Sequence, residues 1–388
     1  MIPTFQFRSV PTLIVEWGVT GKLGELLRKH YPRVSCVGVV TDGFLHGSGL
    51  LDPALESVQA SGLRVIMINT VIADPPEHVV LDAADLARSE GVEIVVGMGG
   101  GSSLDVAKLV AVLLGSHQTL DTMYGVDCIE GVRLPLVQIP TTAGTGAEVT
   151  SVAIVTTGQT TKAGVVSPKL YADIAILDAE LTIGLPSHVT AATGVDAMVH
   201  AIEAFTSARM KNPLSDMLAR RALELLSRNI IAACRDGADR GAREAMLLGA
   251  SLAGQAFSNA PVAAIHALAY PLGSVFHIPH GVSNALLLPH VLRFNASHAA
   301  HLYADVASWI VVPYTHDGVT SSKTNALIDF LERILEEIGL PRTLKAVGVT
   351  RDDLPGLVND AMKQQRLLIN NPRAVSREDA LAIYEAAF

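Results

Sequence analysis

Two side chains near the middle of the chain have the types and the spacing that metal binding requires. Asp196 and His200 lie four residues apart in the segment GVDAMVHAIE (194–203), which has helical character. Residues at positions i and i+4 share one face of a helix, so the carboxylate and the imidazole point the same way. An oxygen and a nitrogen that converge on one point provide half of the ligands of a divalent metal ion.

Histidines further along the chain could complete such a site. Three of them lie close together in IHALAYPLGSVFHIPHG (265–281), whereas most of the 13 histidines must be structural. The candidate ligand set, one oxygen and three nitrogens, is Asp196, His200, His266 and His280. Iron(II) and zinc both accept this set, and such an ion acts as a Lewis acid on a carbonyl or alkoxide oxygen.

A glycine-rich loop, GGGSS (99–103), lies between a predicted strand at 93–97 and a predicted helix at 104–114. Glycines let the backbone approach a phosphate closely, and a helix N-terminus offers unpaired N–H groups and the positive end of a dipole. The loop matches neither the GxGxxG pattern nor a Walker sequence, so a glycine turn without a ligand is an equally good interpretation of this loop alone.

A second loop, PTTAGTG (140–146), shifts the interpretation towards a bound dinucleotide. It also follows a predicted strand, and it adds hydroxyl groups at Thr141, Thr142 and Thr145. Asp42 ends the first predicted strand, where a carboxylate could accept hydrogen bonds from a ribose and would repel a 2′-phosphate. NAD is therefore favoured over NADP, although Asp42 could also serve only the Asp-Gly turn in which it lies.

Short apolar runs alternate with helical patterns in the first half of the chain. Strands are predicted at 35–41, 64–69, 93–97, 134–139, 151–157 and 174–177, and helices at 50–61, 76–90 and 104–114. This alternation indicates a parallel sheet, which binds ligands at the carboxyl ends of its strands. After residue 186 the chain is mostly helical in period, with predicted helices at 216–233, 242–257, 323–339 and 377–387, the last with Ser376 as its N-cap. We expect an α/β dinucleotide-binding domain at 1–183 and an all-helical metal-binding domain at 184–388.

The bulk properties argue against several classes of protein. The 388 residues carry a net charge of −9, whereas a general nucleic-acid-binding protein needs clustered Lys and Arg. Hydrophobic residues make up 49% of the chain and charged residues 17%, as in a compact globular protein. The cysteines Cys36, Cys128 and Cys234 are far apart, which indicates a reducing compartment. We see no secretory signal and no apolar run of about 18 residues, so we expect a cytoplasmic protein without a membrane segment.

Taken together, the motifs resemble those of the iron-containing (group III) alcohol dehydrogenases over nearly the whole chain. The matching segments are GMGGGSSLDVAK (97–108), IPTTAGTGAEVT (139–150), LTIGLPSHVTAATGVDAMVHAIEA (181–204), HALAYPLG (266–273), HIPHG (277–281) and NPR (371–373). The resemblance implies a Rossmann-like N-terminal domain, an all-helical C-terminal domain and a cleft between them, the architecture of the dehydroquinate synthase-like proteins. It also implies a homodimer or a larger assembly.

The resemblance assigns site residues as well. It implies that the metal ligands are Asp196, His200, His266 and His280. It implies cofactor contacts at Asp42, Gly99, Gly100, Ser102, Asp105, Thr141, Thr142, Thr145, Lys162 and Leu181. The chain departs from the family at Tyr270, where many members have a histidine that lies near the metal and helps to carry protons. His277 is the candidate replacement, and the alternative is that Tyr270 only lines the pocket while His277 is a cofactor-side or surface residue.

The expected function is a metal-dependent transfer of hydride between NAD(H) and an alcohol/aldehyde or alcohol/ketone pair. Two related enzymes stay open as alternatives: a maleylacetate reductase, in which the metal motif is usually altered, and a sugar-phosphate lyase of the dehydroquinate synthase type, which needs a basic phosphate pocket. A non-enzymatic scaffold protein would not require four ligands and two cofactor loops. Phe257 and Phe276 could provide apolar walls for the substrate, with ordinary core packing as the alternative for both.

Overall fold

The computed structural model describes residues 4–158, 161–311 and 320–388. The described chain separates into two compact units. One contains Arg8–Thr142 and Gly146–Ile183, and the other contains Gly184–Phe388 together with Ala143–Thr145 and residues 4–7. The chain passes from one unit to the other between Ile183 and Gly184, and the second glycine-rich loop is divided between the units.

The first unit is built on a six-stranded parallel sheet. In spatial order its strands are β1 (Thr12–Val15), β9 (Ile174–Leu177), β6 (Leu136–Pro140), β4 (Ile94–Gly99), β2 (Cys36–Asp42) and β3 (Arg64–Val71). Every neighbouring pair is parallel, as the alternation of strands and helices predicts. The edge strand β1 was not predicted, because a run of four residues is too short to stand out as a strand.

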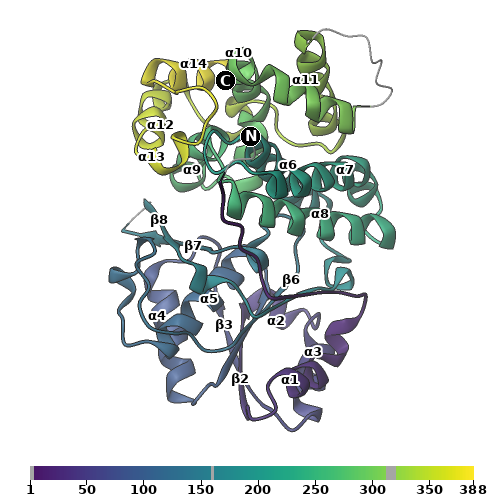
Figure 1. Cartoon of the computed structure of the whole chain (residues 1–388), viewed down its shortest axis with the longest axis vertical. Helices are drawn as coiled ribbons and strands as arrows, with labels where there is room; N and C mark the ends of the chain where they lie inside the picture. The colour runs from purple at the N-terminus through teal and green to yellow at the C-terminus, as the bar shows by residue number, and fades with distance from the viewer. Residues whose placement is uncertain (1–3, 159–160, 312–319) are drawn as a thin grey trace. The chain divides into compact units, whose positions relative to one another are not determined.

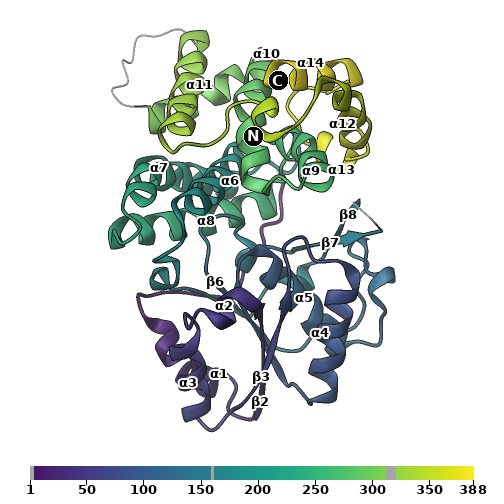
Figure 2. The ribbon, with the colours of Figure 1, turned by 180° about the vertical axis from the view of Figure 1, so that it is seen from behind.

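Helices cover both faces of this sheet. In Figures 1 and 2, α4 (Glu77–Ser89) and α5 (Gly101–Gly115) lie on one face, and α1 (Leu23–His30) and α3 (Asp52–Ala60) lie on the other. Two cores result, because alternate side chains of a strand point to opposite faces. Val40 of β2 belongs to the core under α4 and α5, whereas its neighbour Val39 belongs to the core under α1 and α3. Burial on both faces explains why the central strands of this sheet are largely apolar.

A second, smaller sheet completes the first unit. It contains β5 (Gly125–Val126), β8 (Thr161–Val166) and β7 (Val152–Thr157), with β7 antiparallel to β8. The strand predicted at 151–157 is therefore present, but it lies outside the parallel sheet, and β8 was not predicted. The remaining short elements of this unit are α2 (Gly43–Gly47) and 3-10 helices at Val19–Lys22, Leu120–Thr122, Ala147–Val149, Pro168–Leu170 and Ala179–Thr182.

The second unit is helical throughout its described residues. Its helices are α6 (Ser187–Thr206), α7 (Pro213–Arg235), α8 (Arg240–Asn259), α9 (Ala264–Phe276), α10 (His280–Ile310), α11 (Thr320–Glu337), α12 (Leu354–Ala361), α13 (Gln365–Leu368) and α14 (Arg377–Ala387), with 3-10 turns at Leu344–Val347 and Arg351–Asp353. Helix α6 packs against α7, α8 and α10, and almost all of its residues are buried. It is therefore the central helix of the unit. Ser376 caps α14 as predicted, in a capping box with Asp379. None of the described helices is long and apolar enough to cross a membrane.

Candidate active site

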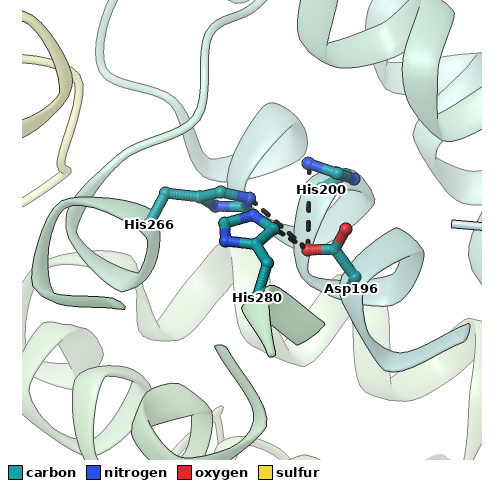
Figure 3. A group of neighbouring side chains, drawn as sticks. All are labelled: Asp196, His200, His266 and His280. Atoms are coloured by element: carbon teal, nitrogen blue, oxygen red, sulfur yellow. Dashed lines mark ion pairs between the residues drawn. The ribbon is translucent and has the colours of Figure 1, made fainter. Parts of the chain in front are cut away.

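Three helices bring the four predicted metal ligands together. Asp196 and His200 project from α6, His266 from α9 and His280 from the first turn of α10 (Figure 3). Their potential ligand atoms all lie within 4.8 Å of one another. From Oδ1 of Asp196, the Nε2 atoms of His280, His266 and His200 are 3.5, 3.7 and 4.0 Å away.

These distances suit one metal ion. Four donors placed about 2.1 Å from an ion at the corners of a tetrahedron lie about 3.4 Å from one another. The three oxygen–nitrogen distances of 3.5, 3.7 and 4.0 Å come close to that value without any rearrangement. An ion would also neutralise Asp196, whose side chain is only 3% exposed. The residues present therefore fit a divalent metal ion.

Gly281 allows α10 to approach α6 closely enough for this convergence. A Cβ atom at Gly281 would lie 2.0 Å from the carbonyl oxygen of Ala192, which no packing tolerates. The preceding residue in the chain is the ligand His280, and Pro279 precedes the helix as its N-cap. In the segment HIPHG, Pro279 precedes the helix, His280 is the predicted ligand, and Gly281 allows the close contact with Ala192.

The His200 ring is held in the form that a metal ion requires. Burial lowers the pKa of His200 to about 3, although Asp196 opposes this shift and His266 reinforces it. The ring is therefore neutral near pH 7, with a lone pair available for an ion. It is stacked between Phe257, with ring centroids 4.3 Å apart, and His266, at 4.6 Å. Phe257, for which a pocket wall and core packing are the two predicted roles, lies directly against a predicted ligand.

Asp196 remains ionised despite its burial. Burial acts to raise the pKa of Asp196, but the three imidazoles and the amide of Asn284 outweigh it and hold the pKa below its usual value. Nδ2 of Asn284 donates to Oδ1 of Asp196 at 2.6 Å. The same nitrogen is 3.3 Å from Nε2 of His266 and 3.3 Å from Nε2 of His280. Asn284 therefore contacts three of the four ligands.

Two residues near the ligands, Asn284 and Glu203, were not predicted as site residues. Asn284 lies four residues after His280, and Glu203 lies seven residues after Asp196, so each shares a helix face with a ligand. Oε2 of Glu203 is 2.7 Å from Nδ1 of His266. Helical spacing could have identified both, but many polar residues have such spacing without any contact to a ligand.

Tyr270 and His277, the candidate replacement for the missing histidine, lie at different places. The ring of Tyr270 is half-buried and lies 5.9 Å from the ring of His280, tilted by 49°. His277 is exposed and ends α9 in the left-handed conformation, with φ at 56°. Tyr270 thus adjoins a ligand, whereas His277 does not belong to the convergent group.

The two glycine-rich loops lie side by side at one edge of the parallel sheet. They follow β4 and β6, which are adjacent strands. The backbone N–H of Thr141 donates to the carbonyl oxygen of Gly99 at 3.0 Å, and a Cβ atom at Gly100 would lie 3.8 Å from the side chain of Thr142. Gly99 has φ at +152°, and a Cβ atom there would lie 2.7 Å from Oγ of Ser103, so glycine is required. Ser102 is in the first turn of α5, whose N-terminus has no side-chain cap. This arrangement suits a phosphate ligand.

The other residues with a predicted cofactor contact are scattered over several elements. Asp42 ends β2, next to β4, and its Oδ1 caps α2 by accepting the N–H of Leu45 at 2.9 Å. Asp105 accepts the N–H of Ile154 and pairs with buried Lys108, and burial raises the pKa of its carboxyl group.

Lys162 is on β8, where it pairs with Asp74 at 2.6 Å and donates to Thr156 at 2.9 Å. Leu181 is buried in the turn at Ala179–Thr182, and Thr145 belongs to the helical unit. Asp42 therefore lies at the same sheet edge as the two loops, whereas Lys162 lies on the smaller sheet.

Comparison with known proteins shows the family and the fold of the chain. The family model for iron-containing alcohol dehydrogenase matches residues 11–179, and the model for the C-terminal domain of the Fe-containing alcohol dehydrogenase family matches residues 190–388. Long-chain-alcohol dehydrogenase 1 of Geobacillus thermodenitrificans (strain NG80-2) is 39% identical, over 97% of this chain and 95% of that protein. The NAD-dependent methanol dehydrogenase of Bacillus methanolicus is 30% identical, over 97% of this chain and 98% of its own. A crystal structure of 1,3-propanediol oxidoreductase superposes with a TM-score of 0.95 at 32% identity and covers 100% of both chains.

The chain belongs to the iron-containing alcohol dehydrogenase family. It is accordingly an oxidoreductase that interconverts alcohols and carbonyl compounds with a nicotinamide cofactor. The fold expected from the resemblance, a parallel α/β part followed by an all-helical part, is confirmed.

Proposed function

We propose that the protein transfers hydride between NAD(H) and an alcohol/aldehyde pair, with an iron(II) ion held by Asp196, His200, His266 and His280. The observation that carries the proposal is the convergence of these four side chains within 4.8 Å. The family supports iron, and zinc is the alternative because the same donors accept both ions.

An ion bound there supplies Lewis-acid polarisation of the substrate oxygen, and a bound nicotinamide accepts or supplies the hydride. The chain's own residues provide the rest. Asp196, His200 and His266 are buried, so these donors are shielded from water. The amide of Asn284 holds Oδ1 of Asp196 towards the imidazoles, which keeps the donors in place before any ligand arrives.

We assign the cofactor to the carboxyl ends of β2, β4 and β6. The proposed pyrophosphate contacts are the glycines and hydroxyl groups of 99–103 and 140–146, and Asp42 is the proposed ribose contact. A carboxylate at that position favours NAD over NADP because it would repel a 2′-phosphate. The similarity to an NAD-dependent methanol dehydrogenase supports the same choice. Asp105, Lys162, Thr145 and Leu181 stay proposed cofactor contacts on the resemblance alone.

Tyr270 and His277 are the proposed proton-handling groups. The contact of Tyr270 with the His280 ring supports a place for it beside the substrate. An unperturbed phenol has a pKa of about 10, so it donates a hydrogen bond near neutral pH but carries protons poorly. His277 is exposed and could pass a proton to water. A homodimer and a cytoplasmic location also stay predictions.

Spectrophotometry of NADH tests the proposed activity. Protein loaded with iron(II) in the absence of oxygen is mixed with NAD and a series of primary alcohols, or with NADH and the corresponding aldehydes. We expect turnover with at least one pair, and we expect D196N, which weakens the ligand set while keeping its shape, to lose it. Absence of turnover by the iron-loaded protein with every alcohol and every aldehyde would contradict the proposal.

A further inference from the structure

The helix that carries His266 begins without a capping residue of its own. Its N-cap position is Ala263, which has no polar side-chain atom and makes no side-chain cap. Ala263 and Ile265 are each only 1% exposed, so water cannot satisfy their backbone N–H groups. A helix start that is buried in this way needs hydrogen-bond acceptors from elsewhere in the fold.

Glu203 of α6 provides those acceptors. Its Oε2 accepts the N–H of Ala263 at 2.9 Å, and its Oε1 accepts the N–H of Ile265 at 2.7 Å. The side chain is only 4% exposed. A carboxylate at a helix N-terminus is stabilised both by these hydrogen bonds and by the helix dipole. Glu203 therefore caps α9 from a different helix.

The same carboxylate also fixes the imidazole of His266. Oε2 of Glu203 lies 2.7 Å from Nδ1 of His266. An ionised carboxylate only accepts hydrogen bonds, so Nδ1 of His266 must carry the proton in this contact. A neutral imidazole then has its lone pair on Nε2, the atom that lies 3.7 Å from Oδ1 of Asp196. The ring therefore presents its free lone pair to the ligand group.

We propose that Glu203 is a positioning residue that prepares His266 for a divalent cation and sets the charge of the cation to be bound. Together with Asp196 it places two carboxylates beside the imidazoles of the helical unit, and the charge of a divalent ion balances that pair. Carboxylate partners of this kind orient histidine ligands and raise their basicity. The inference rests on the proposed metal site, and it adds the residue that couples the start of α9 to that site.

Other contacts hold the segment before α9 without Glu203, so a substitution can be tested in the folded protein. Oγ of Ser207 donates to the carbonyl oxygen of Pro261 at 2.8 Å. Nδ2 of Asn370 donates to the carbonyl oxygen of Val262 at 3.0 Å. These bonds fix the position of the segment, whereas Glu203 is bonded both to the N–H groups of Ala263 and Ile265 and to the His266 ring.

Cobalt(II) binding to E203Q tests the proposal. Glutamine keeps the shape, but its single oxygen cannot accept three N–H groups, and its amide removes the charge. The affinity of the full-length protein for Co²⁺ is measured by competition with a chelator, together with the visible absorption spectrum of the bound Co²⁺. We expect E203Q to bind Co²⁺ about 10- to 100-fold more weakly, with a changed spectrum.

N295A is the matched control for a general loss of stability. Asn295 and Asn371 form a reciprocal buried amide pair in the same unit, with bonds of 3.0 and 2.7 Å. Asn295 lies on α10, about 22 Å along the helix from His280 at 1.5 Å per residue. We expect N295A to be less stable than the wild type but to bind Co²⁺ with unchanged affinity and spectrum.

The outcomes separate the two claims. If the wild-type protein binds no Co²⁺, the proposed metal site is wrong. If the wild type binds Co²⁺ and E203Q binds it equally well with the same spectrum, only the role of Glu203 is overturned. NMR of metal-free wild-type protein with ¹⁵N-labelled histidine gives a test that does not depend on the variant. The His266 signal is identified by its loss in H266Q. We expect His266 to be protonated on Nδ1, and protonation on Nε2 alone would overturn the proposal.

Discussion

Asn284 and Asp196 lie 88 residues apart in the chain, and the amide nitrogen of the first donates to the carboxylate of the second at 2.6 Å. Both side chains are buried. In the metal-free protein this is a hydrogen bond to a charged group in a site with little water, which is the kind of bond that costs most to lose. It also ties α10 to α6 beside the predicted ligands.

N284A should therefore destabilise the metal-free protein. We expect the free energy of unfolding to fall by about 1–3 kcal/mol, because a buried carboxylate loses its amide donor. Urea denaturation in the presence of a chelator measures the change. With a bound metal ion the loss should be smaller, since the ion then neutralises Asp196. N229A, which removes an amide bonded to the carbonyl of Leu225 on α7, is the control and should change stability little. An equal loss in N284A and N229A would contradict this role for Asn284.

The buried His200 should make the metal-free protein sensitive to acid. Its pKa is lowered by burial to about 3 in the folded protein, against about 6.5 in an unfolded chain. Between these values the unfolded chain binds a proton that the folded protein does not, so stability is fully present above pH 6.5 and falls as the pH decreases. One such group contributes a slope of about 1.4 kcal/mol per pH unit. H200F keeps a ring against Phe257. Its free energy of unfolding, measured by urea denaturation, should fall less steeply between pH 6.5 and 5 than that of the wild type. If the free energy of unfolding falls equally steeply with pH in H200F and in the wild type, His200 is not the cause of the acid sensitivity.

The charge of Asp42 should determine the choice of cofactor. Asparagine is as good a helix N-cap as aspartate, so D42N should keep the cap on α2 and lose only the charge. We expect kcat/KM for NADP to rise by about tenfold relative to that for NAD, because repulsion of the 2′-phosphate is reduced. Steady-state rates with both cofactors measure the ratio, and an unchanged melting temperature confirms that the fold is intact. If the ratio does not change, Asp42 serves only the turn.

H277N tests the proposed proton route. Asparagine tolerates the left-handed conformation that ends α9, so the backbone should be undisturbed while the titrating imidazole is removed. If His277 carries protons, one limb of the pH profile of kcat/KM should shift or flatten, and the rate at neutral pH should fall by about tenfold or more. A profile that coincides with that of the wild type would remove His277 from the route and leave Tyr270 and water.

The sequence predicted the parallel sheet well because both of its faces are buried. Strands such as β2, β4 and β6 are largely apolar runs, and each ends at glycine, proline or an acidic residue. The smaller sheet was not separated from the larger one, since its strands have the same local character and only their partners differ. Helix α5 begins three residues earlier than predicted, at Gly101, because glycine has a low helix propensity and disguises the first turn.

In the candidate site, too, local sequence patterns predicted some residues, whereas others depend on contacts between helices. The pair Asp196 and His200 follows from helical spacing alone, and that spacing needs no knowledge of the fold. The convergence of His266 and His280 on that pair depends on how α9 and α10 pack against α6. Glu203 and Asn284 were missed because each makes its decisive contact across helices, to His266 and to Asp196, and no local pattern encodes such a contact.

The central claim is that one metal ion, held by Asp196, His200, His266 and His280, is required for activity. Titration of metal-stripped protein with iron(II) in the absence of oxygen, with bound metal and NADH formation followed in the same samples, tests it most directly. We predict no activity before addition, a rise that saturates at one ion per chain, and neither binding nor activity in a variant that carries both D196N and H266Q. Full activity of the stripped protein, or full activity of that variant, would contradict the account.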